Sequence, residues 1–458
     1  MPVTEDGALR PMNPTELGAL VDGIWKDARA EWARLLTLQK RIEGKLLRTW
    51  MPDNTDLEYK DLFRKASSPW LMFARDSIAQ GLRIDGYSSE DVWRDAWQAS
   101  GMDGRQGQLN REVVGLGYGF GIALPAEQAG KALMRPLSAL NTYATFADPW
   151  DVRPSAVLHL VAGRLGRVEG QRWMFVDAEG VYRWSGDART PRDMTFYPHG
   201  LDYNPVARID NTYAMGGAPQ SSIEQAVPVY QRIVDATFTL QMVQRYGAFP
   251  QKWMAGGELA VDAAGNPLVR SSVDGLLHAS GETGESARFG TFTAANLDQV
   301  VTAVDAHIKH FAALVQVPPH YLLGAIVNMS AEGIAAAESG YFRNISDRKT
   351  SLGEGYELWF RNAADILGDD SASDTSTEVH WSDESARSLA QISDAVVKLK
   401  TLDAPLEMLF ALVPGWSKSD AVEAAEYVRQ RELDRARQIA ELRPAPPAAL
   451  PPGPSAGG

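Results

Sequence analysis

Apolar residues recur at helical spacing through most of this chain. In several long segments they return every three or four positions, which is typical of a helix with one buried face. The pattern predicts helices at residues 15–48, 69–82, 89–98, 108–116, 221–246, 297–315, 331–367, 384–402, 406–412 and 418–442. Short alternating or β-branched runs, separated by turns that contain Gly and Asp, predict that residues 141–215 are mostly β-strand. The pattern is that of an α+β protein.

The most regular helical pattern lies in residues 297–315. Six apolar residues recur there at steps of four and three: Leu297, Val301, Val304, Ile308, Phe311 and Val315. A mean spacing of about 3.5 residues is typical of helices that pack lengthwise on one another. We therefore expect these six side chains, called the seam below, to pack this helix against other helices.

Two helices with polar start signals flank a segment that lacks a long apolar helix. Ser221 and Glu224 have the spacing of a capping box before the first helix, and Asn296 and Gln299 have it before the second. Residues 250–295 between these helices are Gly-rich and predict a compact β insertion. The segment is expected to form a helical hairpin with a small β tip.

A loop follows the second of these helices. Pro318 and Pro319 end the helical pattern, an apolar stretch follows, and Ser330 begins the next long helix. That helix contains Gly353 and Gly355. Each glycine costs up to about 1 kcal/mol relative to alanine in a helix interior, so a bend is expected there.

Composition limits the classes of protein that this chain can be. With 458 residues it is expected to form two or more subdomains. Its net charge of −13 excludes a protein that grips DNA tightly, because neutralising phosphates requires basic side chains. The N-terminus lacks the apolar core of a signal peptide, and polar residues interrupt the uncharged stretch at 311–331, so no membrane span is expected. The Pro-rich tail, residues 443–458, is predicted to be disordered.

Candidate chemistry is sparse. The chain has no cysteine, which excludes disulfides and thiolate zinc sites. His307 and His310 have a spacing that can hold a metal ion, but no third ligand accompanies them, so a solvated or packed pair is expected. Neither the phosphate-binding loop of nucleotide hydrolases nor the Gly-x-Ser-x-Gly elbow is present. No catalytic residue, metal or cofactor is predicted.

The segment around the loop carries a family resemblance. The sequence PPHYLLG at residues 318–324 precedes a box formed by Asn328, Ser330, Ala331 and Glu332, and the long helix follows. This order resembles the portal proteins of tailed bacteriophages, of the siphophage type from Gram-positive and actinobacterial hosts. Further matches, which extend the resemblance from roughly residue 40 to 440, include FARDSIAQGLRIDGY (73–87), WQASGMD (97–103), GLGYGF (115–120), Asp148-Pro149, Asn204-Pro205-Val206 and Asn211.

The resemblance implies a portal fold with a mixed α/β wing, a two-helix stem, a small β clip, a long kinked helix and an α-helical crown. The implied divisions are 1–220 for the N-terminal arm and wing, 221–249 for the first stem helix, 250–295 for the clip, 296–323 for the second stem helix, 324–331 for the tunnel loop, 332–383 for the long kinked helix and a wing strand, 384–442 for the crown, and 443–458 for the tail.

The resemblance also implies a function. Portal proteins form a ring of about twelve subunits at one capsid vertex. The ring is the conduit through which double-stranded DNA is packaged and ejected, and it docks the terminase large subunit and the head–tail adaptor. Major capsid and scaffolding proteins are further implied partners, and the implied location is the virion, after assembly in the cytoplasm of the host bacterium. The tunnel-loop residues implied to lie nearest DNA are Gly324, Ala325, Ile326, Val327, Asn328, Met329 and Ser330.

One alternative remains open at this point. The 13 tryptophans of this acidic chain could line the substrate cleft of a soluble hydrolase, although most lie in periodic segments where core packing is expected. The native mass separates the two classes, because the hydrolase would be a monomer or small oligomer rather than a large ring.

Overall fold

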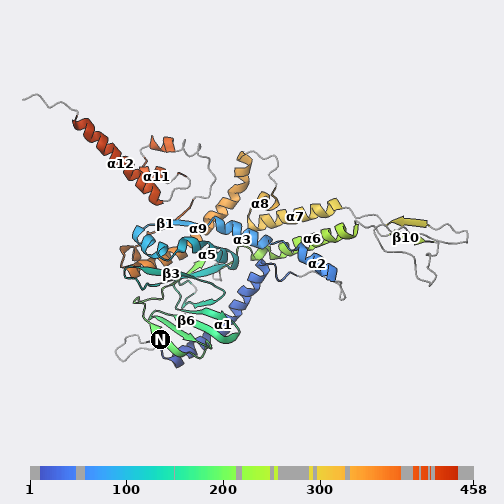
Figure 1. The fold of residues 1–458 in the computed structure, drawn as a ribbon, viewed down its shortest axis with the longest axis horizontal. Coiled ribbons are helices and arrows are strands. Elements are labelled where there is room, and N and C mark those ends of the chain that lie inside the picture. The colour runs from blue at the N-terminus through green and yellow to red at the C-terminus, as the bar shows by residue number, and fades with distance from the viewer. Residues whose placement is uncertain are drawn as a thin grey trace, which may run out of the picture. The chain divides into compact units, whose positions relative to one another are not determined.

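The computed structural model describes residues 11–47, 57–148, 150–212, 219–247, 252–255, 288–291, 297–324, 331–382, 396–401, 404–410, 413 and 418–441. These residues belong to two compact units that divide between Val379 and His380 (Figure 1). The predicted tail and most of the predicted tunnel loop lie outside the described residues. Within the described part of the chain, every helix is too short or too polar to cross a membrane.

The first unit begins with helix α1 (Pro14–Ile42). A capping box holds its first turn: the Asn13 side chain accepts a hydrogen bond from the Glu16 N–H, and the Glu16 carboxylate accepts one from the Asn13 N–H. The helix was predicted to continue to residue 48 and instead ends at Ile42. Gly44 adopts a left-handed conformation there (φ 70°) and its N–H closes the last turn on the Arg41 carbonyl.

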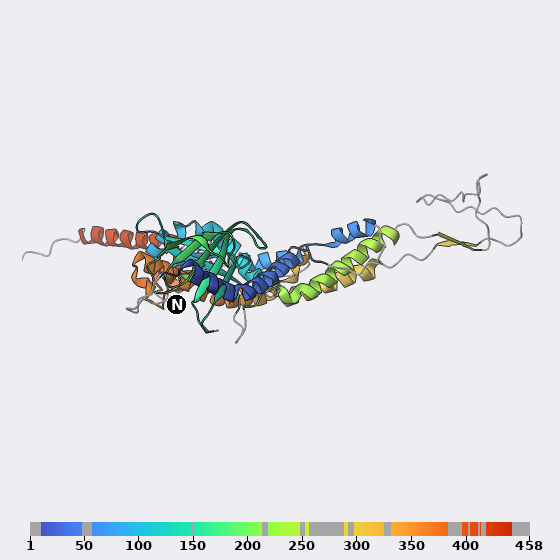
Figure 2. The same ribbon diagram turned by 90° about the horizontal axis from the view of Figure 1, so that it is seen from below.

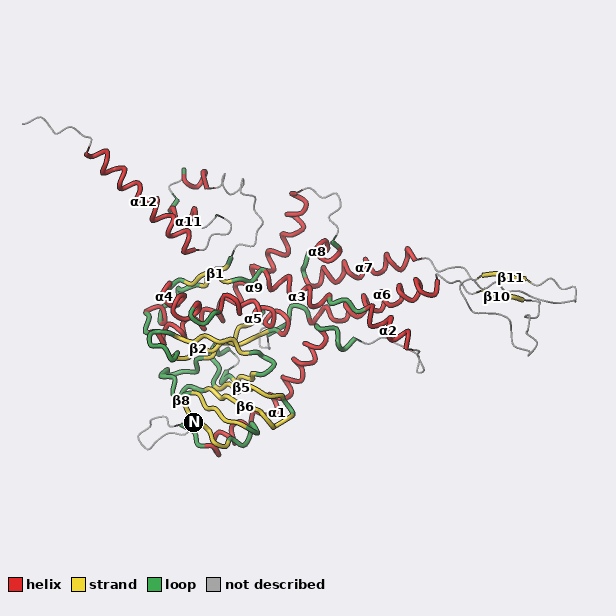
Figure 3. The backbone as a smooth tube through the Cα atoms, viewed as in Figure 1, coloured by secondary structure: helices red, strands yellow, loops and turns green. Residues whose placement is uncertain are grey.

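A five-stranded antiparallel sheet lies against α1 (Figure 3). Its order is β4 (Thr142–Thr145), β5 (Ala156–Arg164), β6 (Arg167–Val176), β7 (Val181–Ser185) and β8 (Arg192–Tyr197). Alternate side chains of the sheet form one core with α1: Leu17, Val21, Ala28 and Trp32 with Leu158, Leu160, Trp173, Phe175, Tyr182 and Trp184. Burying each large side chain stabilises the fold by about 1.5–3 kcal/mol. The prediction that this region is mostly β is confirmed.

A three-stranded antiparallel sheet forms the second layer, in the order β3 (Ala132–Leu137), β2 (Tyr118–Pro125) and β9 (Val206–Asp210). Helices α5 (Met102–Leu116) and α9 (Ala331–Leu367) pack on it. A Cβ atom on Gly121 would lie 2.3 Å from the Trp359 ring, so the glycine lets α9 approach the strand. Within GLGYGF, Gly115 and Gly119 are also closely packed, against the side chains of Arg75 and Leu109, whereas Gly117 caps α5 in a left-handed conformation (φ 105°).

Helix α9 is continuous through the two glycines that predicted a bend. A Cβ atom on Gly355 would lie 2.7 Å from the Arg208 carbonyl oxygen of β9. The close contact between helix and sheet offsets the cost of a glycine in the helix. Gly355 is therefore explained by packing, without a bend in α9. The bend itself stays a prediction.

Shorter elements complete the core around the second half of α9. They are α3 (Trp70–Gln80), β1 (Ile84–Tyr87), α4 (Glu90–Val92), a π-helix (Trp93–Gln98), a 3₁₀ turn (Asp370–Ala372) and β12 (Val379–Trp381). The box WQASGMD has a structural explanation: the Trp97 indole N–H donates to Asp103 (2.9 Å), and the Ser100 hydroxyl accepts from the Met134 N–H (2.8 Å). The ring of Trp97 stacks on Phe360 of α9. These residues connect the π-helix to both the sheet and α9.

Two long helices and a pair of short strands form the predicted hairpin. A 3₁₀ turn (Glu224–Ala226) precedes α6 (Val227–Gly247), and β10 (Lys252–Ala255) pairs antiparallel with β11 (Arg288–Thr291) before α7 (Leu297–Val315) and α8 (Pro319–Leu323). Figures 1 and 2 both show α6 and α7 side by side. The rest of the β insertion and the capping residue Asn296 lie outside the described residues.

In the second unit, α11 (Leu406–Phe410) packs against α12 (Lys418–Glu441). Leu409 of α11 and Ala421 and Ala425 of α12 are buried, and Arg429 forms an ion pair with Glu407. Residues 396–400 are also helical, and the remainder of the predicted helix 384–402 lies outside the described residues.

Candidate functional site

Helices α6 and α7 pack along one another and form the first candidate element. Each helix has one buried face, comprising Tyr230, Ile233 and Val234 on α6 and Ile308, Phe311 and Val315 on α7. A third helix that the sequence did not predict, α2 (Leu57–Ala66), lies along α6. The Phe63 and Phe238 rings meet edge to face at 5.7 Å, and Arg245 forms an ion pair with Glu58 at 2.7 Å.

The structure divides the six predicted seam residues into two groups. Ile308, Phe311 and Val315 are buried within the chain, as helix-on-helix packing requires. Val304 is half-buried, whereas Leu297 and Val301 retain 39% and 43% exposure. The described residues of this chain therefore cover only the C-terminal part of the seam and leave its N-terminal part exposed.

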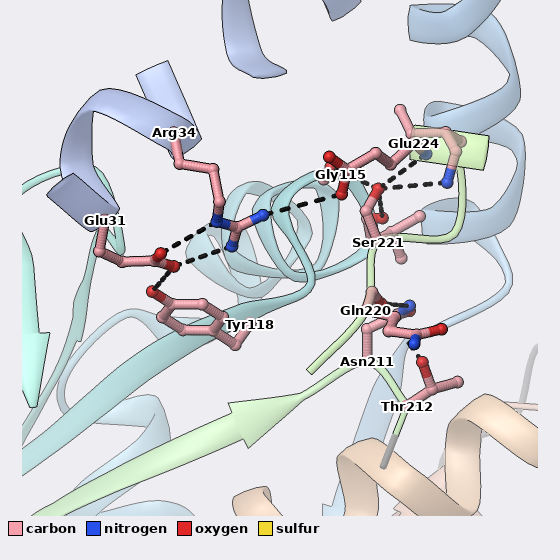
Figure 4. A network of polar contacts seen from close by, with 11 residues as sticks. Glu31, Arg34, Gly115, Tyr118, Asn211, Thr212, Gln220, Ser221 and Glu224 are labelled. Carbon is pink, nitrogen blue, oxygen red and sulfur yellow. Dashed lines mark hydrogen bonds and ion pairs between the residues drawn. The ribbon is translucent and has the colours of Figure 1, made fainter. Parts of the chain in front are cut away.

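A polar network connects the base of the hairpin to the body of the first unit (Figure 4). Glu31 and Arg34 of α1 form an ion pair (2.8 Å), the Tyr118 hydroxyl of β2 donates to Glu31 (2.7 Å), and Arg34 lies 3.7 Å from the Glu224 carboxylate. Burial raises the pKa of Glu31, but hydrogen bonds from Arg34 and Tyr118 outweigh it and the net shift is downward. Glu31 therefore stays charged, and α1 holds the turn that precedes α6.

Ser221 and Asn211 complete this connection. The Ser221 hydroxyl donates to the Gly115 carbonyl (2.7 Å) and accepts from the Glu224 N–H (3.2 Å), which is one half of the predicted capping box. The Asn211 side chain donates to the Gln220 carbonyl (2.6 Å). Both side chains form hydrogen bonds with main-chain groups, so they fix the direction in which the chain enters α6.

A carboxylate and a ring contact join α8 to α9: Tyr321 of α8 meets the Tyr341 ring of α9 edge to face at 5.9 Å, besides its hydrogen bond to Glu338. The chain leaves α7 through Gln316, which adopts a left-handed conformation (φ 55°), and Pro318. Glu338 of α9 accepts a hydrogen bond from the Tyr321 hydroxyl (2.9 Å) and lies 3.3 Å from His320 Nε2. Burial, followed by the hydrogen bond and charge of Glu338, raises the pKa of Tyr321 to about 12. We call this contact between α8 and α9 the Glu338 clamp.

The predicted tunnel loop begins where the clamp ends. Gly324 caps α8 in a left-handed conformation (φ 65°), and its N–H donates to the His320 carbonyl (3.0 Å). Ala325, Ile326, Val327, Asn328, Met329 and Ser330 lie outside the described residues. The structure thus describes the two anchors of the loop, α8 and the start of α9.

The structure describes the two candidate histidines and five buried tryptophans. His307 is half-buried and His310 is exposed on α7, and no group of three or more His, Asp or Glu side chains in the described ranges could hold a metal ion. The tryptophans Trp32, Trp97, Trp173, Trp184 and Trp359 are buried in the two cores. These five side chains are therefore packing residues rather than a sugar-binding platform.

Sequence reasoning missed the Glu338 clamp. A single glutamate on a long amphipathic helix looks like a solvated residue, and only its contact with α8 gives it a role. His320, a polar residue in an otherwise uncharged stretch, was the one signal that could have indicated a nearby polar partner.

The chain is similar in sequence to two curated portal proteins. It is 26% identical over 360 residues to the portal protein of Mycobacterium phage D29, an alignment that covers 71% of this chain and 70% of that protein. It is 25% identical over 358 residues to the portal protein of Mycobacterium phage L5, with the same coverage. No protein-family model matches the chain.

Among solved structures, the chain is similar to chains of gene transfer agent particles. The virion of a native particle contains a chain with a TM-score of 0.46 and 14% identity, and the match covers 82% of this chain and 99% of that one. The neck of a native particle, computed with C12 symmetry, gives a TM-score of 0.46 and 14% identity over 79% of this chain and 94% of that one.

Proposed function

We propose that this chain is the portal protein of a tailed bacteriophage. The observation that carries the proposal is the similarity to two phage portal proteins over 71% of this chain, which spans 70% of each relative. Three of the segments that indicated the family have defined places in the structure. Residues 97–103 connect the π-helix to α5, residues 115–120 connect α5 to β2, and residues 318–324 contain α8. The proposed role is structural and requires no catalytic residue.

The chain acts, in this proposal, as one subunit of a ring of about twelve copies. Helices α6 and α7 are the stem, and the insertion that contains β10 and β11 is the clip. Support comes from the exposed residues of the seam, Leu297 and Val301, which are large apolar side chains. They continue the line of buried seam residues along α7, so they offer an apolar surface to a helix of a neighbouring subunit. The exposed residues contact the next subunit.

The ring encloses the passage for double-stranded DNA during packaging and ejection. Residues 324–331 are the tunnel loop nearest to the DNA, and this segment contains neither Lys nor Arg. With a net charge of −13 per chain, the ring does not hold the phosphates that pass through it. The Glu338 clamp fixes one anchor of the loop on α9.

The ring is located at one vertex of the capsid within the virion and is assembled in the cytoplasm of the host. Its partners are the terminase large subunit, the head–tail adaptor, and the major capsid and scaffolding proteins. The second unit, with residues 384–442, is the crown. These assignments follow the portal proposal.

Native mass spectrometry of the purified chain tests the proposal. Twelve copies of a 50.1 kDa chain give a ring of about 600 kDa, and negative-stain images should show an annular particle with a central hole. A species that remains monomeric or dimeric at micromolar concentrations would contradict the ring and favour the alternative of a small acidic enzyme.

A further inference from the structure

A pocket of about 630 Å³ lies between the three-stranded and the five-stranded sheet of the first unit. Strands β2 and β3 line one side, and β5 to β8 line the other. Side chains of a strand alternate between faces, so Leu158 and Leu160 of β5 pack toward α1 while His159 and Val161 line the pocket. The pocket therefore uses the face of the five-stranded sheet that α1 leaves uncovered.

Four arginines from four different strands line this pocket: Arg135 of β3, Arg172 of β6, Arg183 of β7 and Arg192 of β8. The strand register explains why they gather. Ser185 lies opposite both Arg172 and Arg192, and it shares a sheet face with Arg183, two residues away on β7. Three of the arginines thus project from one face of the five-stranded sheet, and Arg135 comes from the other sheet.

The charge of these arginines is not balanced within the pocket. All four are exposed, and none forms an ion pair with a carboxylate among the described residues. Asp193 is the one carboxylate that lines the pocket. Burial lowers the pKa of His159 to about 4, so this residue is neutral at pH 7 and adds no charge. In a chain whose net charge is −13, this is a local concentration of positive charge within a cleft, where it acts most strongly on an anion.

The pocket also offers apolar and main-chain contacts. Ile122, Leu124, Leu137, Val161 and Met174 contribute apolar side chains to its lining. Strand β3 is an edge strand of the three-stranded sheet, and β8 is an edge strand of the five-stranded sheet. An edge strand leaves one row of main-chain N–H and C=O groups available for another strand. These features suit a peptide better than an inorganic anion or a nucleotide, neither of which uses a strand edge.

We propose that this pocket, lined by Arg135, Arg172, Arg183 and Arg192, binds an extended acidic peptide segment of a partner protein. Carboxylates of the peptide pair with the arginines, because the guanidinium fork matches a carboxylate in two hydrogen bonds. Apolar side chains at alternate positions contact the aliphatic lining, and the peptide backbone adds to the β8 edge. A DNA duplex is a poor fit, because specific complexes bury roughly 1,000 Å² or more of open protein surface, and this pocket is a recess between two sheets. The proposal stands whether or not the chain forms a ring.

Fluorescence anisotropy of a labelled peptide tests the proposal on the full chain. The probe is a fluorescein-labelled peptide of six Glu-Val repeats, and a Lys-Val peptide of the same length is the charge control. We expect the double variant R172E/R183E to bind the acidic peptide at least about tenfold more weakly than the wild type, because two charge-assisted contacts become repulsions. The matched control is R164E/R167E, which makes the same charge change on β5 and β6 outside the pocket lining and should bind within about twofold of the wild type.

Several outcomes would overturn the proposal. They are failure of the wild type to bind the acidic peptide, equal loss of binding in both double variants, and equal binding of the Lys-Val peptide. Displacement of the peptide by a 20-base-pair DNA duplex or by millimolar phosphate, at matched ionic strength, would assign the pocket to phosphate instead. Circular dichroism and thermal midpoints of R172E/R183E should match the wild type, since both arginines are exposed; the more conservative variant R172K/R183K provides a second test if they do not.

Discussion

Glu112 of α5 is a carboxyl group that folding makes harder to ionise. Its carboxylate accepts a hydrogen bond from the Ala139 N–H, yet burial raises the pKa to about 7. Between pH 4.5 and 7 the folded chain holds a proton here that the unfolded chain has lost, so stability falls as pH rises through this window. Burial lowers the pKa of His159 to about 4, so this histidine has the opposite effect between pH 4 and 6.5.

We predict that Glu112→Gln removes the loss of stability that Glu112 causes as pH rises. The variant should match the wild type near pH 4, where Glu112 is mostly protonated in both the folded and the unfolded chain, and should become more stable than the wild type by up to about 3 kcal/mol at pH 8. Thermal or urea unfolding at several pH values measures the difference. Glu127→Gln, the same substitution at an exposed position, is the control. A constant offset between Glu112→Gln and the wild type across this range would contradict the assignment.

Gly121 is the residue where sheet and helix approach most closely. Gly121→Ala should destabilise the first unit by about 1–3 kcal/mol, because the new methyl group overlaps the Trp359 ring. Gly107→Ala on α5 is the matched control: nothing lies within 4 Å of its Cβ position, and alanine in a helix should add about 0.5–1 kcal/mol. Equal midpoints for the two variants in urea unfolding would show that α9 does not rest on β2.

At the scale of elements, the hairpin combines a covered and an uncovered stretch of one apolar seam. Ile308 is 5% exposed, so a charge there would disrupt the packing of the chain itself. Leu297 and Val301 are better probes of assembly, because each is more than a third exposed.

We predict that Leu297→Glu with Val301→Glu prevents ring formation while leaving the subunit folded, because contact between subunits would bury unpaired charges. Native mass spectrometry should report a monomer, and circular dichroism should be unchanged. Gln299→Glu with Ala306→Glu places charged side chains on other faces of the same helix and should leave the ring intact. Rings of full mass from the seam variant would place this stretch of α7 away from the subunit interface.

The Glu338 clamp gives a second prediction at this scale. Glu338→Ala removes the acceptor for Tyr321, so α8 should open more often, and amide exchange in residues 319–324 should rise roughly tenfold. Glu338→Gln keeps an acceptor and should raise exchange less. Exchange in α6 and in the first half of α7 serves as the internal reference, and unchanged exchange in α8 would rule out the clamp.

At the scale of the whole molecule, the portal proposal requires that DNA slides through the ring without being held. Val327→Arg would add one positive charge per subunit to the proposed tunnel loop, and each neutralised phosphate contributes a salt slope of about 0.9 in log affinity. Rings should form normally, whereas DNA packaging should stall, most strongly at low salt. Val327→Gln is the uncharged control. Packaged DNA of normal length from Val327→Arg at every salt concentration would place residue 327 away from the channel.

The sequence by itself determined the positions of helices and strands whose pattern of apolar residues is contained within the element. The periodicity of apolar residues located α3, α6, α7, α9 and α12, because a helix with one buried face repeats that face every three or four residues whatever it packs against. The alternating runs located the region of β4 to β8 for a similar reason. The family resemblance rested on short motifs, and the similarity to two portal proteins agrees with it.

Only the tertiary structure decided which surfaces are covered and which side chains meet. The six seam residues form one pattern in sequence, yet the fold buries Ile308, Phe311 and Val315 and leaves Leu297 and Val301 exposed. The four arginines of the pocket, Arg135, Arg172, Arg183 and Arg192, are spread along the chain from residue 135 to residue 192. Strand register brings Arg172, Arg183 and Arg192 together, and the packing of the two sheets adds Arg135. Such contacts depend on how distant segments of the chain pack together. A short stretch of sequence contains no pattern that indicates its distant partner.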